Sequence, residues 1–157
     1  MNVVHVQPIS AEAFSPFGRV LGAAPGGLRT DHRDLVRNLR PQARPSLAQV
    51  RADDLGGRQS LEVAMLERHA YSSQTFFPLD VGRYLVAVCG GGEDGPDPAT
   101  LLAFSVPGNV GIHYHPGTWH MGIGALAGSG DFLMLVHEDG TPGDCEFRPV
   151  APLRIEW

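Results

Sequence analysis

The chain contains no lysine, and all twelve of its basic residues are arginine. Chemistry through a lysine Schiff base is therefore excluded, because it requires a side-chain amine. A phosphate-binding P-loop is excluded as well, since that motif depends on its lysine. The GxSxG motif that carries the nucleophile of α/β-hydrolases is also missing. These absences remove several large enzyme classes.

Charge is scarce in general: charged residues make up 18% of the chain, and the net charge is −5. Nucleic-acid binding usually needs a basic face, and an anionic membrane surface attracts basic proteins, so neither partner is expected. No apolar stretch reaches the length of a membrane span. The first residues, MNVVHVQPIS, lack the basic start and long apolar run of a signal peptide, which predicts a cytoplasmic protein.

Cysteine is nearly absent, with Cys89 and Cys145 far apart and no CxxC pair. A zinc knuckle or a thioredoxin-type motif is therefore excluded. In a cytoplasmic chain both thiols are expected to be reduced. Cys89 ends an apolar run and is predicted to be a core residue.

Glycine and proline, by contrast, are frequent, with 20 and 13 residues spread along the chain. They cut 157 residues into short segments, which predicts a single β-rich domain over residues 1–157, built as a sandwich or barrel. RYLVAVCG and DFLMLVHE are typical of buried strands. Ser10 is placed to cap a short helical turn. The polar, arginine-rich stretch 26–46 is interpreted as a loop with strand fragments, whose arginines form a solvated face.

The segment SLEVAMLERH, residues 60–69, is ambiguous between helix and strand. As a strand it would carry alternate residues on one face. That face would consist of Leu61, Val63, Met65, Glu67 and His69.

Three of the seven histidines fall within GIHYHPGTWHMG, residues 111–122. On a strand His113 and His115 share a face, and the following Pro-Gly turn allows His120 to return near them. Imidazole is a common metal ligand, so three histidines, or two with a carboxylate, would suit zinc, nickel, iron or manganese. Glu67 and His69 are further candidates. The alternative is a crowded hairpin without chemistry. Tyr114 and Trp119 are either packing residues or substrate contacts.

Four blocks of the chain together resemble the ureidoglycolate lyase family, which belongs to the cupins. The blocks are PISAEAFSPFGRV (8–20), LERHAYSSQTFFPL (66–79), HYHPGTWH (113–120) and DFLMLVHED (131–139). The resemblance implies an all-β, cupin-type double-stranded β-helix, a jelly-roll barrel, with short helical turns. It also implies cleavage of (S)-ureidoglycolate to glyoxylate and urea in allantoin breakdown, and a homodimer. Nickel has been ascribed to the family.

The cupin plan assigns roles to individual residues. Glu67, His69 and Gln74 occupy the spacing of the first metal motif, and His120 that of the second motif's histidine. A divalent metal, nickel or zinc, would be held there, although a glutamine is a neutral and weaker ligand than a glutamate. A metal-free version, with the same groups working as acid and base, remains open.

The chain departs from the family pattern in the second block. His113 stands where the family usually has Asn, Pro116 where an Arg or similar residue is common, and Met121 where a further His is often found. His113 is a candidate to replace that missing histidine. If it does not, the substrate would differ.

Cleavage of a hemiaminal needs a base for the hydroxyl proton and an acid for the leaving urea. His115, assisted by His113, is the predicted acid/base group. Arg51 is predicted to bind the substrate carboxylate, since its fork fits a carboxylate bidentately. Tyr114 and Trp119 are the other candidate substrate contacts. Another cupin enzyme, an isomerase or dioxygenase acting on a small polar carboxylic acid, and a non-catalytic small-molecule binding module are the alternatives.

Overall fold

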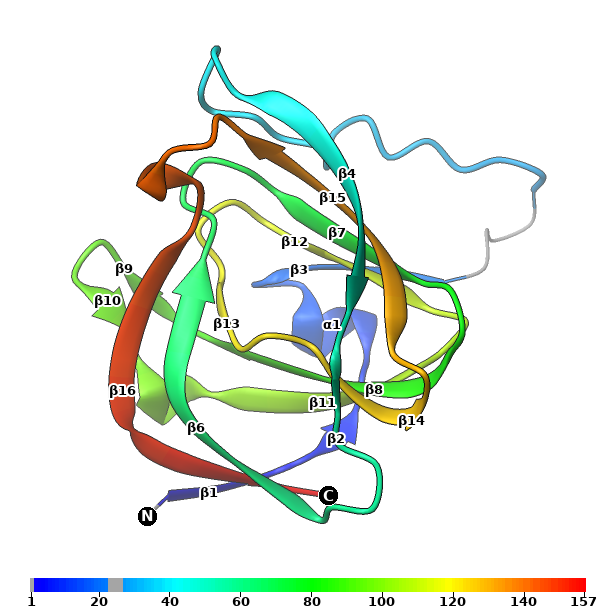
Figure 1. Ribbon diagram of the computed structural model, residues 1–157, viewed down its shortest axis with the longest axis vertical. Coiled ribbons are helices and arrows are strands. Elements are labelled where there is room, and N and C mark those ends of the chain that lie inside the picture. The colour runs from blue at the N-terminus through cyan, green and yellow to red at the C-terminus, as the bar shows by residue number, and fades with distance from the viewer. Residues whose placement is uncertain (1, 23–26) are drawn as a thin grey trace.

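The protein is built from two facing β-sheets, seen in a computed structural model that describes residues 2–22 and 27–157 (Figure 1). One sheet has nine strands, in the order β1-β16-β6-β13-β8-β11-β2, with β14 beside β8 and β5 beside β14. The other has five strands, in the order β3-β12-β7-β15-β4. The predicted all-β, jelly-roll barrel is confirmed.

The nine-stranded sheet consists of β1 (Asn2–His5), β2 (Gln7–Pro8), β5 (Asp53–Asp54), β6 (Ser60–Arg68), β8 (Val81–Cys89), β11 (Leu102–Pro107), β13 (Trp119–His120), β14 (Gly124–Gly128) and β16 (Glu146–Glu156). The five-stranded sheet consists of β3 (Gly18–Leu21), β4 (Arg44–Arg51), β7 (Gln74–Pro78), β12 (Gly111–Tyr114) and β15 (Asp131–Glu138). The remaining elements are the hairpin β9 (Gly91–Gly92) and β10 (Gly95–Pro96), the helix α1 (Ala11–Phe14), and the 3₁₀ turns η1 (Pro98–Thr100) and η2 (Pro142–Asp144). The predicted helical turn is α1, and the Ser10 hydroxyl caps it by accepting from Ala13 N at 3.1 Å.

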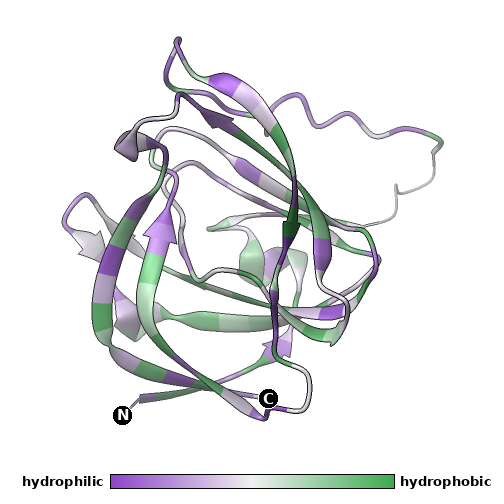
Figure 2. Ribbon diagram, viewed as in Figure 1, coloured by the Kyte–Doolittle hydropathy of each residue, from purple (hydrophilic) through white to green (hydrophobic). Residues whose placement is uncertain are grey.

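The apolar side chains form two clusters, one on each face of β8. Val86 and Val88 point between the two sheets, while Leu85 and Cys89 pack on the opposite face. A strand buried on both faces needs a continuous apolar run, which is what RYLVAVCG provides. Strands buried on one face alternate instead, and Figure 2 shows green and purple bands following one another along β16. Cys89 is 2% exposed, which confirms it as a core residue.

Strand β6 confirms the strand interpretation of its segment, but the strict alternation predicted for it is wrong. Val63 and Leu66 are buried in the same cluster, and Met65 is 49% exposed. The pairing with β16 shifts between Met65–Pro149 and Val63–Leu153, so β16 carries extra residues opposite this point. Such a bulge kinks and twists a strand and changes the face on which its later side chains lie.

Residues 27–43 connect β3 to β4 without a regular element, as predicted for most of this stretch; Gly26 lies outside the described residues. The segment is nevertheless held in place by backbone bonds from Ser73 N to Arg37 O at 3.0 Å and from Leu39 N to Tyr71 O at 2.8 Å. Leu35 is buried. The idea that its arginines are all solvated is wrong for Arg40, whose side chain is 12% exposed.

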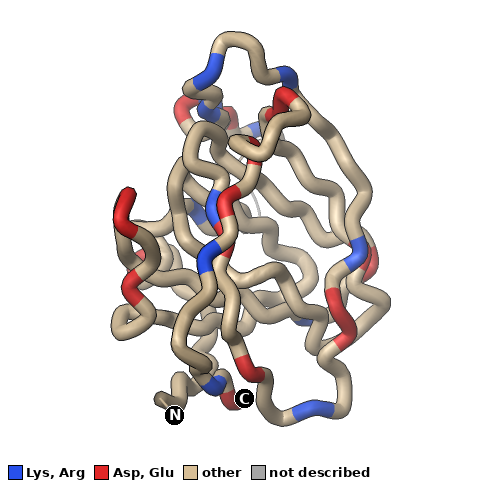
Figure 3. Tube along the Cα trace, turned by 60° about the vertical axis from the view of Figure 1, so that its left-hand side comes forward, with Lys and Arg blue, Asp and Glu red and all other residues tan. Residues whose placement is uncertain are grey.

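Charges of both signs are interspersed along the chain in the view of Figure 3. Among the described residues, no helix has the length and apolar character needed to cross a membrane.

Candidate metal and acid–base site

Three side chains converge between the two sheets: Glu67, His69 and His120. Glu67 and His120 lie directly opposite each other where β6 pairs with β13. Their Oε1 and Nε2 atoms are 3.4 Å apart, and each of the three residues offers a ligand atom within 4.8 Å of the other two. His69 is 8% exposed and His120 is 2% exposed. The fold thus brings together both predicted ligand motifs.

Both histidines are held through Nδ1 by backbone carbonyls. His69 Nδ1 lies 2.8 Å from Asp144 O, and His120 Nδ1 lies 2.8 Å from Thr118 O. A carbonyl can only accept, so the Nδ1 of each ring carries a proton and each Nε2 faces the cluster. His120 Nε2 is buried without a hydrogen-bond partner in the described parts of the chain. Histidines that bind metals are oriented in this way, by a hydrogen bond from the other ring nitrogen.

The electrostatics leave this set anionic at Glu67 and neutral at His69. Burial raises the pKa of Glu67, but contacts with His120 and His69 outweigh it, and the pKa lies below its usual value. The pKa of His69 is lowered by burial and by the neighbouring His120. A carboxylate with two imidazoles is a ligand set suited to a divalent transition metal. The residues therefore fit the predicted metal.

The ring of Tyr114 supports the ring of His120. Their centroids are 4.3 Å apart and their planes differ by 17°. Tyr114 is 1% exposed and belongs to the core between the sheets, and its buried hydroxyl has no hydrogen-bond partner among the described residues. The packing interpretation therefore describes Tyr114 better than a substrate contact does.

Trp119 is a core residue as well, with 1% of its surface exposed. It precedes His120 on β13 and so lies on the opposite face of the sheet. Arg68 covers its ring, with the guanidinium 4.6 Å from the ring centroid, and donates to Glu146 at 2.7 Å. Arg68 thus points away from Glu67, and Trp119 lies on the face of the sheet away from the cluster of Glu67, His69 and His120.

His113 and His115 lie outside this cluster, which corrects the prediction that His120 returns near them. Tyr114, the last residue of β12, points into the space between the sheets, so His113 before it faces the other way. His113 is 1% exposed and its Nδ1 lies 2.8 Å from Thr75 Oγ1, while burial and His115 lower its pKa to about 4. His115 lines a separate pocket beside Phe17. The acid/base role predicted for this pair has no support in the geometry.

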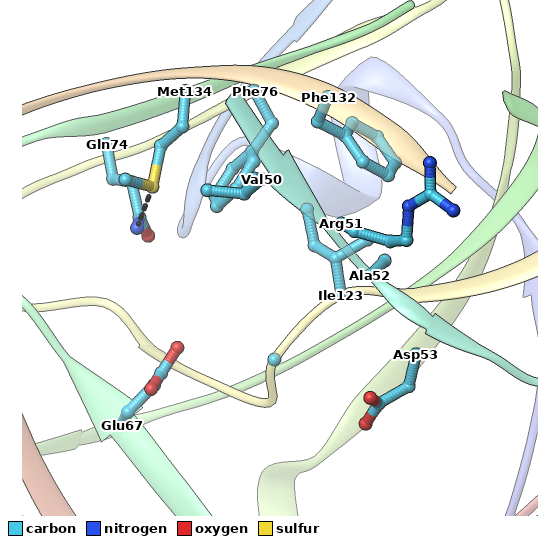
Figure 4. Close-up of a pocket in the computed structure, with 11 residues that line it drawn as sticks. Val50, Arg51, Ala52, Asp53, Glu67, Gln74, Phe76, Ile123, Phe132 and Met134 are labelled. Atoms are coloured by element: carbon cyan, nitrogen blue, oxygen red, sulfur yellow. Dashed lines mark hydrogen bonds between the residues drawn. The ribbon is translucent and has the colours of Figure 1, made fainter. Parts of the chain in front are cut away.

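A pocket of about 290 Å³ opens beside Glu67 (Figure 4). Its lining residues are Val50, Arg51, Ala52, Asp53, Glu67, Gln74, Phe76, Gly122, Ile123, Phe132 and Met134. Gln74 and Glu67 face each other across it in Figure 4. Gln74 Nε2 donates to Met134 Sδ at 3.2 Å, but the buried Oε1 has no partner in the described chain. An unpaired buried acceptor beside a cavity favours a ligand that donates to it.

Arg51 contributes to the rim of this pocket, but its guanidinium points outward in Figure 4. It is paired bidentately with Asp131, with distances of 2.7 Å from Nε and 2.6 Å from Nη2. Val50 faces inward, and alternation turns the next side chain outward. The fork predicted for the substrate carboxylate is therefore occupied by Asp131.

Sequence reasoning missed some neighbours of the site. Asp53 is a second carboxylate on the pocket wall, and Cys145 Sγ lies 3.8 Å from Glu67 Oε2. The third is the Asp144 carbonyl that binds His69. A backbone carbonyl has no signature in a sequence, and Asp144 and Cys145 come from the connection between β15 and β16, far from Glu67 in the chain.

The chain is similar to a set of known proteins along nearly its whole length. The model of the family described as ureidoglycolate lyase matches residues 1–156. A protein of Agrobacterium fabrum, which its name assigns provisionally to ureidoglycolate lyase, is 34% identical over 158 residues, covering 99% of this chain and 96% of the relative. The ureidoglycolate lyase of Pseudomonas aeruginosa strain PAO1 is 32% identical over 155 residues, covering 93% of this chain and 89% of the relative.

Among solved structures, a dTDP sugar isomerase from Desulfovibrio desulfuricans G20 matches with a TM-score of 0.43 and 20% identity, covering 85% of this chain and 82% of that one. The whole-chain match and the level of identity lead to one conclusion: this chain belongs to the ureidoglycolate lyase family.

Proposed function

We propose that this protein is a ureidoglycolate lyase that converts (S)-ureidoglycolate to glyoxylate and urea. The observation that carries the proposal is the pairing of an ionised carboxylate with two oriented imidazoles at a pocket that also holds an unpaired amide oxygen. Membership of the family supplies the reaction.

The reaction moves a single proton. It leaves the hydroxyl oxygen as the carbonyl of glyoxylate forms, the carbon–nitrogen bond breaks, and the nitrogen of the departing urea receives a proton. One group can therefore accept the proton and return it. Glu67 is the group we assign, because its carboxylate is ionised and lines the pocket.

Gln74 matches the ureido end of the substrate. That end carries N–H donors, and the buried Oε1 of Gln74 is an acceptor without a partner among the described residues. The apolar walls formed by Phe76, Phe132 and Ile123 limit water around the reacting carbon. Gln74 is therefore proposed as a substrate contact in place of its predicted role as metal ligand.

The substrate carboxylate needs a positive charge, and Arg51 is the only basic residue among the described residues that line the pocket. Its fork is already paired with Asp131. A divalent metal, nickel or zinc, held by His69, His120 and one carboxylate oxygen of Glu67 would supply that charge and lower the pKa of the bound hydroxyl, while the second Glu67 oxygen would take the proton. This charge balance favours the metal-dependent version over the metal-free one.

The test measures urea and glyoxylate release from racemic ureidoglycolate, with the spontaneous rate subtracted. We expect release that is lost with a chelator and restored by one metal, and that falls at least ~100-fold in His120→Ala, as expected when a group in the reaction site is removed. His5→Ala is the matched control, because His5 is exposed and far in sequence from Glu67, His69 and His120. Release that is indifferent to chelator would contradict the metal. Absence of urea from every preparation would contradict the lyase and favour another small polar acid as substrate.

We also propose that the protein is a cytoplasmic homodimer. The outer face of the five-stranded sheet supports this, because Leu47 and Phe77 are 68% and 46% exposed there, beside Leu133 and Leu135. Exposed apolar faces commonly bind a partner. Sedimentation velocity on the wild type and on Leu47→Asp tests it: a wild-type dimer that dissociates in the variant is expected, and a wild-type monomer would contradict it.

A further inference from the structure

Arg40 is the one arginine of the 27–43 segment that the structure draws inward. Its side chain is 12% exposed, and it pairs with Asp144 through Nη2 and with Asp139 through Nη1 at 3.1 Å. Those carboxylates are 13% and 11% exposed. Half-buried charges are retained when they are paired and hydrogen-bonded, so this arrangement is more ordered than a surface ion pair.

The two carboxylates organise the loop between β15 and β16. Asp144 accepts from the backbone N–H groups of Asp139 and Gly140, at 2.9 and 2.7 Å. Asp139 accepts from Thr141 N and from Gln42 Nε2, both at 3.1 Å. The loop is therefore folded around its own acidic side chains, and Arg40 is the cation that compensates them.

This loop reaches the site at two points. The Asp144 carbonyl binds His69 Nδ1 at 2.8 Å, and the neighbouring Cys145 thiol lies 3.8 Å from Glu67 Oε2. The carbonyl and the carboxylate of Asp144 belong to one residue, so the group that Arg40 holds is the residue that orients His69.

Arg40 is also fixed to the chain that follows His69. Its guanidinium lies over the ring of Tyr71, 5.4 Å from the centroid, and the preceding residue, Leu39, donates to Tyr71 O. Arg40 thus joins the two segments that flank His69, one in sequence and one in space.

We propose that Arg40 is a positioning residue for the site: it holds the loop 139–145 so that the Asp144 carbonyl keeps the proton of His69 on Nδ1 and its Nε2 lone pair directed at the cluster. Arg40 makes none of the contacts that form the cluster itself, so it acts through Asp144. The inference rests on the proposed function only for its effect on turnover.

The test compares the wild type with Arg40→Met, which keeps the length of the side chain and removes its charge and fork. Long-range ¹H–¹⁵N spectra at pH 8 report which ring nitrogen of His69 carries the proton, with signals assigned by comparison with His69→Gln. We expect the Nδ1–H tautomer alone in the wild type and a mixture in Arg40→Met. Turnover, measured as kcat/KM, should fall ~10-fold, the lower end of the range for partners of a site residue.

Arg29→Met is the matched control, because Arg29 lies on the same segment and pairs with Asp31 at an exposed position, 74% and 49% exposed. Unchanged His69 signals in Arg40→Met, or equal changes in both variants, would overturn the proposal. If circular dichroism shows that Arg40→Met does not fold, Arg40→Lys replaces it in the test. This variant keeps the positive charge, so we expect a smaller shift toward the mixture of His69 tautomers. A wild type that releases no urea would contradict the lyase, while the tautomer comparison would still decide the role of Arg40.

Discussion

Tyr114 is the residue at which packing and substrate binding predict opposite results. Its hydroxyl is buried without a hydrogen-bond partner among the described residues, while its ring stacks on His120. An unpaired buried hydroxyl costs about 1–3 kcal/mol. Tyr114→Phe removes that group and keeps the ring, so we expect the free energy of unfolding to rise by about 1 kcal/mol. In a protein of this size that corresponds to a melting temperature about 2–4 °C higher.

Tyr114→Leu removes the ring and should behave in the opposite way. The ring lies against Phe14 and Phe76 as well as His120, with centroid distances of 6.1, 6.3 and 4.3 Å. Each aromatic pair contributes about 0.5–1.5 kcal/mol beyond its buried area, so a loss of about 2–4 kcal/mol is expected. The His120 ring loses its support, and kcat should fall ~10-fold, as for other residues that orient a site histidine.

Thermal unfolding and steady-state release of urea measure both effects. Phe104→Leu is the control, because Phe104 is fully buried in the same core and contacts Phe14 at 5.9 Å. It should lower stability comparably with little effect on kcat. A rise in KM together with a drop in stability for Tyr114→Phe would refute the reasoning, since the hydroxyl would then have a partner in the substrate.

Further predictions concern charge and pH. Glu67→Gln should lower kcat ~100-fold while the protein stays folded, because the amide cannot take the hydroxyl proton; wild-type kcat from this variant would contradict the assignment. Arg51→Met should leave KM within about twofold and the melting temperature nearly unchanged, because its pair with Asp131 is an exposed surface ion pair; a large rise in KM would restore its predicted carboxylate role. His113 has a folded-state pKa lowered to about 4, so the unfolded chain binds its proton first as the pH falls. Its contribution to stability is therefore present above about pH 6.5 and is lost toward pH 4, and His113→Gln should flatten that part of the stability–pH curve measured by urea unfolding.

Much of the fold could be predicted because strand patterns are local. The apolar runs at β8 and β15 and the Pro-Gly turn before β13 each occupy a few consecutive residues. The two motif histidines His69 and His120, with Glu67, could likewise be singled out, since their spacing follows the family pattern. Residue type alone then indicates a ligand set of carboxylate and imidazole.

The errors arose where alternation had to be related to a partner strand. The bulge in β16 lies some 80 residues beyond the part of β6 that it twists, so Met65 was placed on the wrong face. Arg51 was predicted to bind the substrate carboxylate. In the structure its guanidinium is already paired with Asp131 on the neighbouring strand β15. Neither pairing has a signal within the segment that it affects.

By itself, the sequence determined the all-β class, the absence of lysine chemistry and the chemical nature of the candidate ligands, because these follow from composition and from local period. Only the tertiary structure decided which histidines meet. Period two puts His113 and Tyr114 on opposite faces of β12, but the face that becomes the interior depends on how two sheets close on each other. In this protein Tyr114 faces His120, His113 faces outward, and a loop carbonyl held near Arg40 orients His69. Such long-range contacts form only when the whole barrel closes, so no single segment contains them.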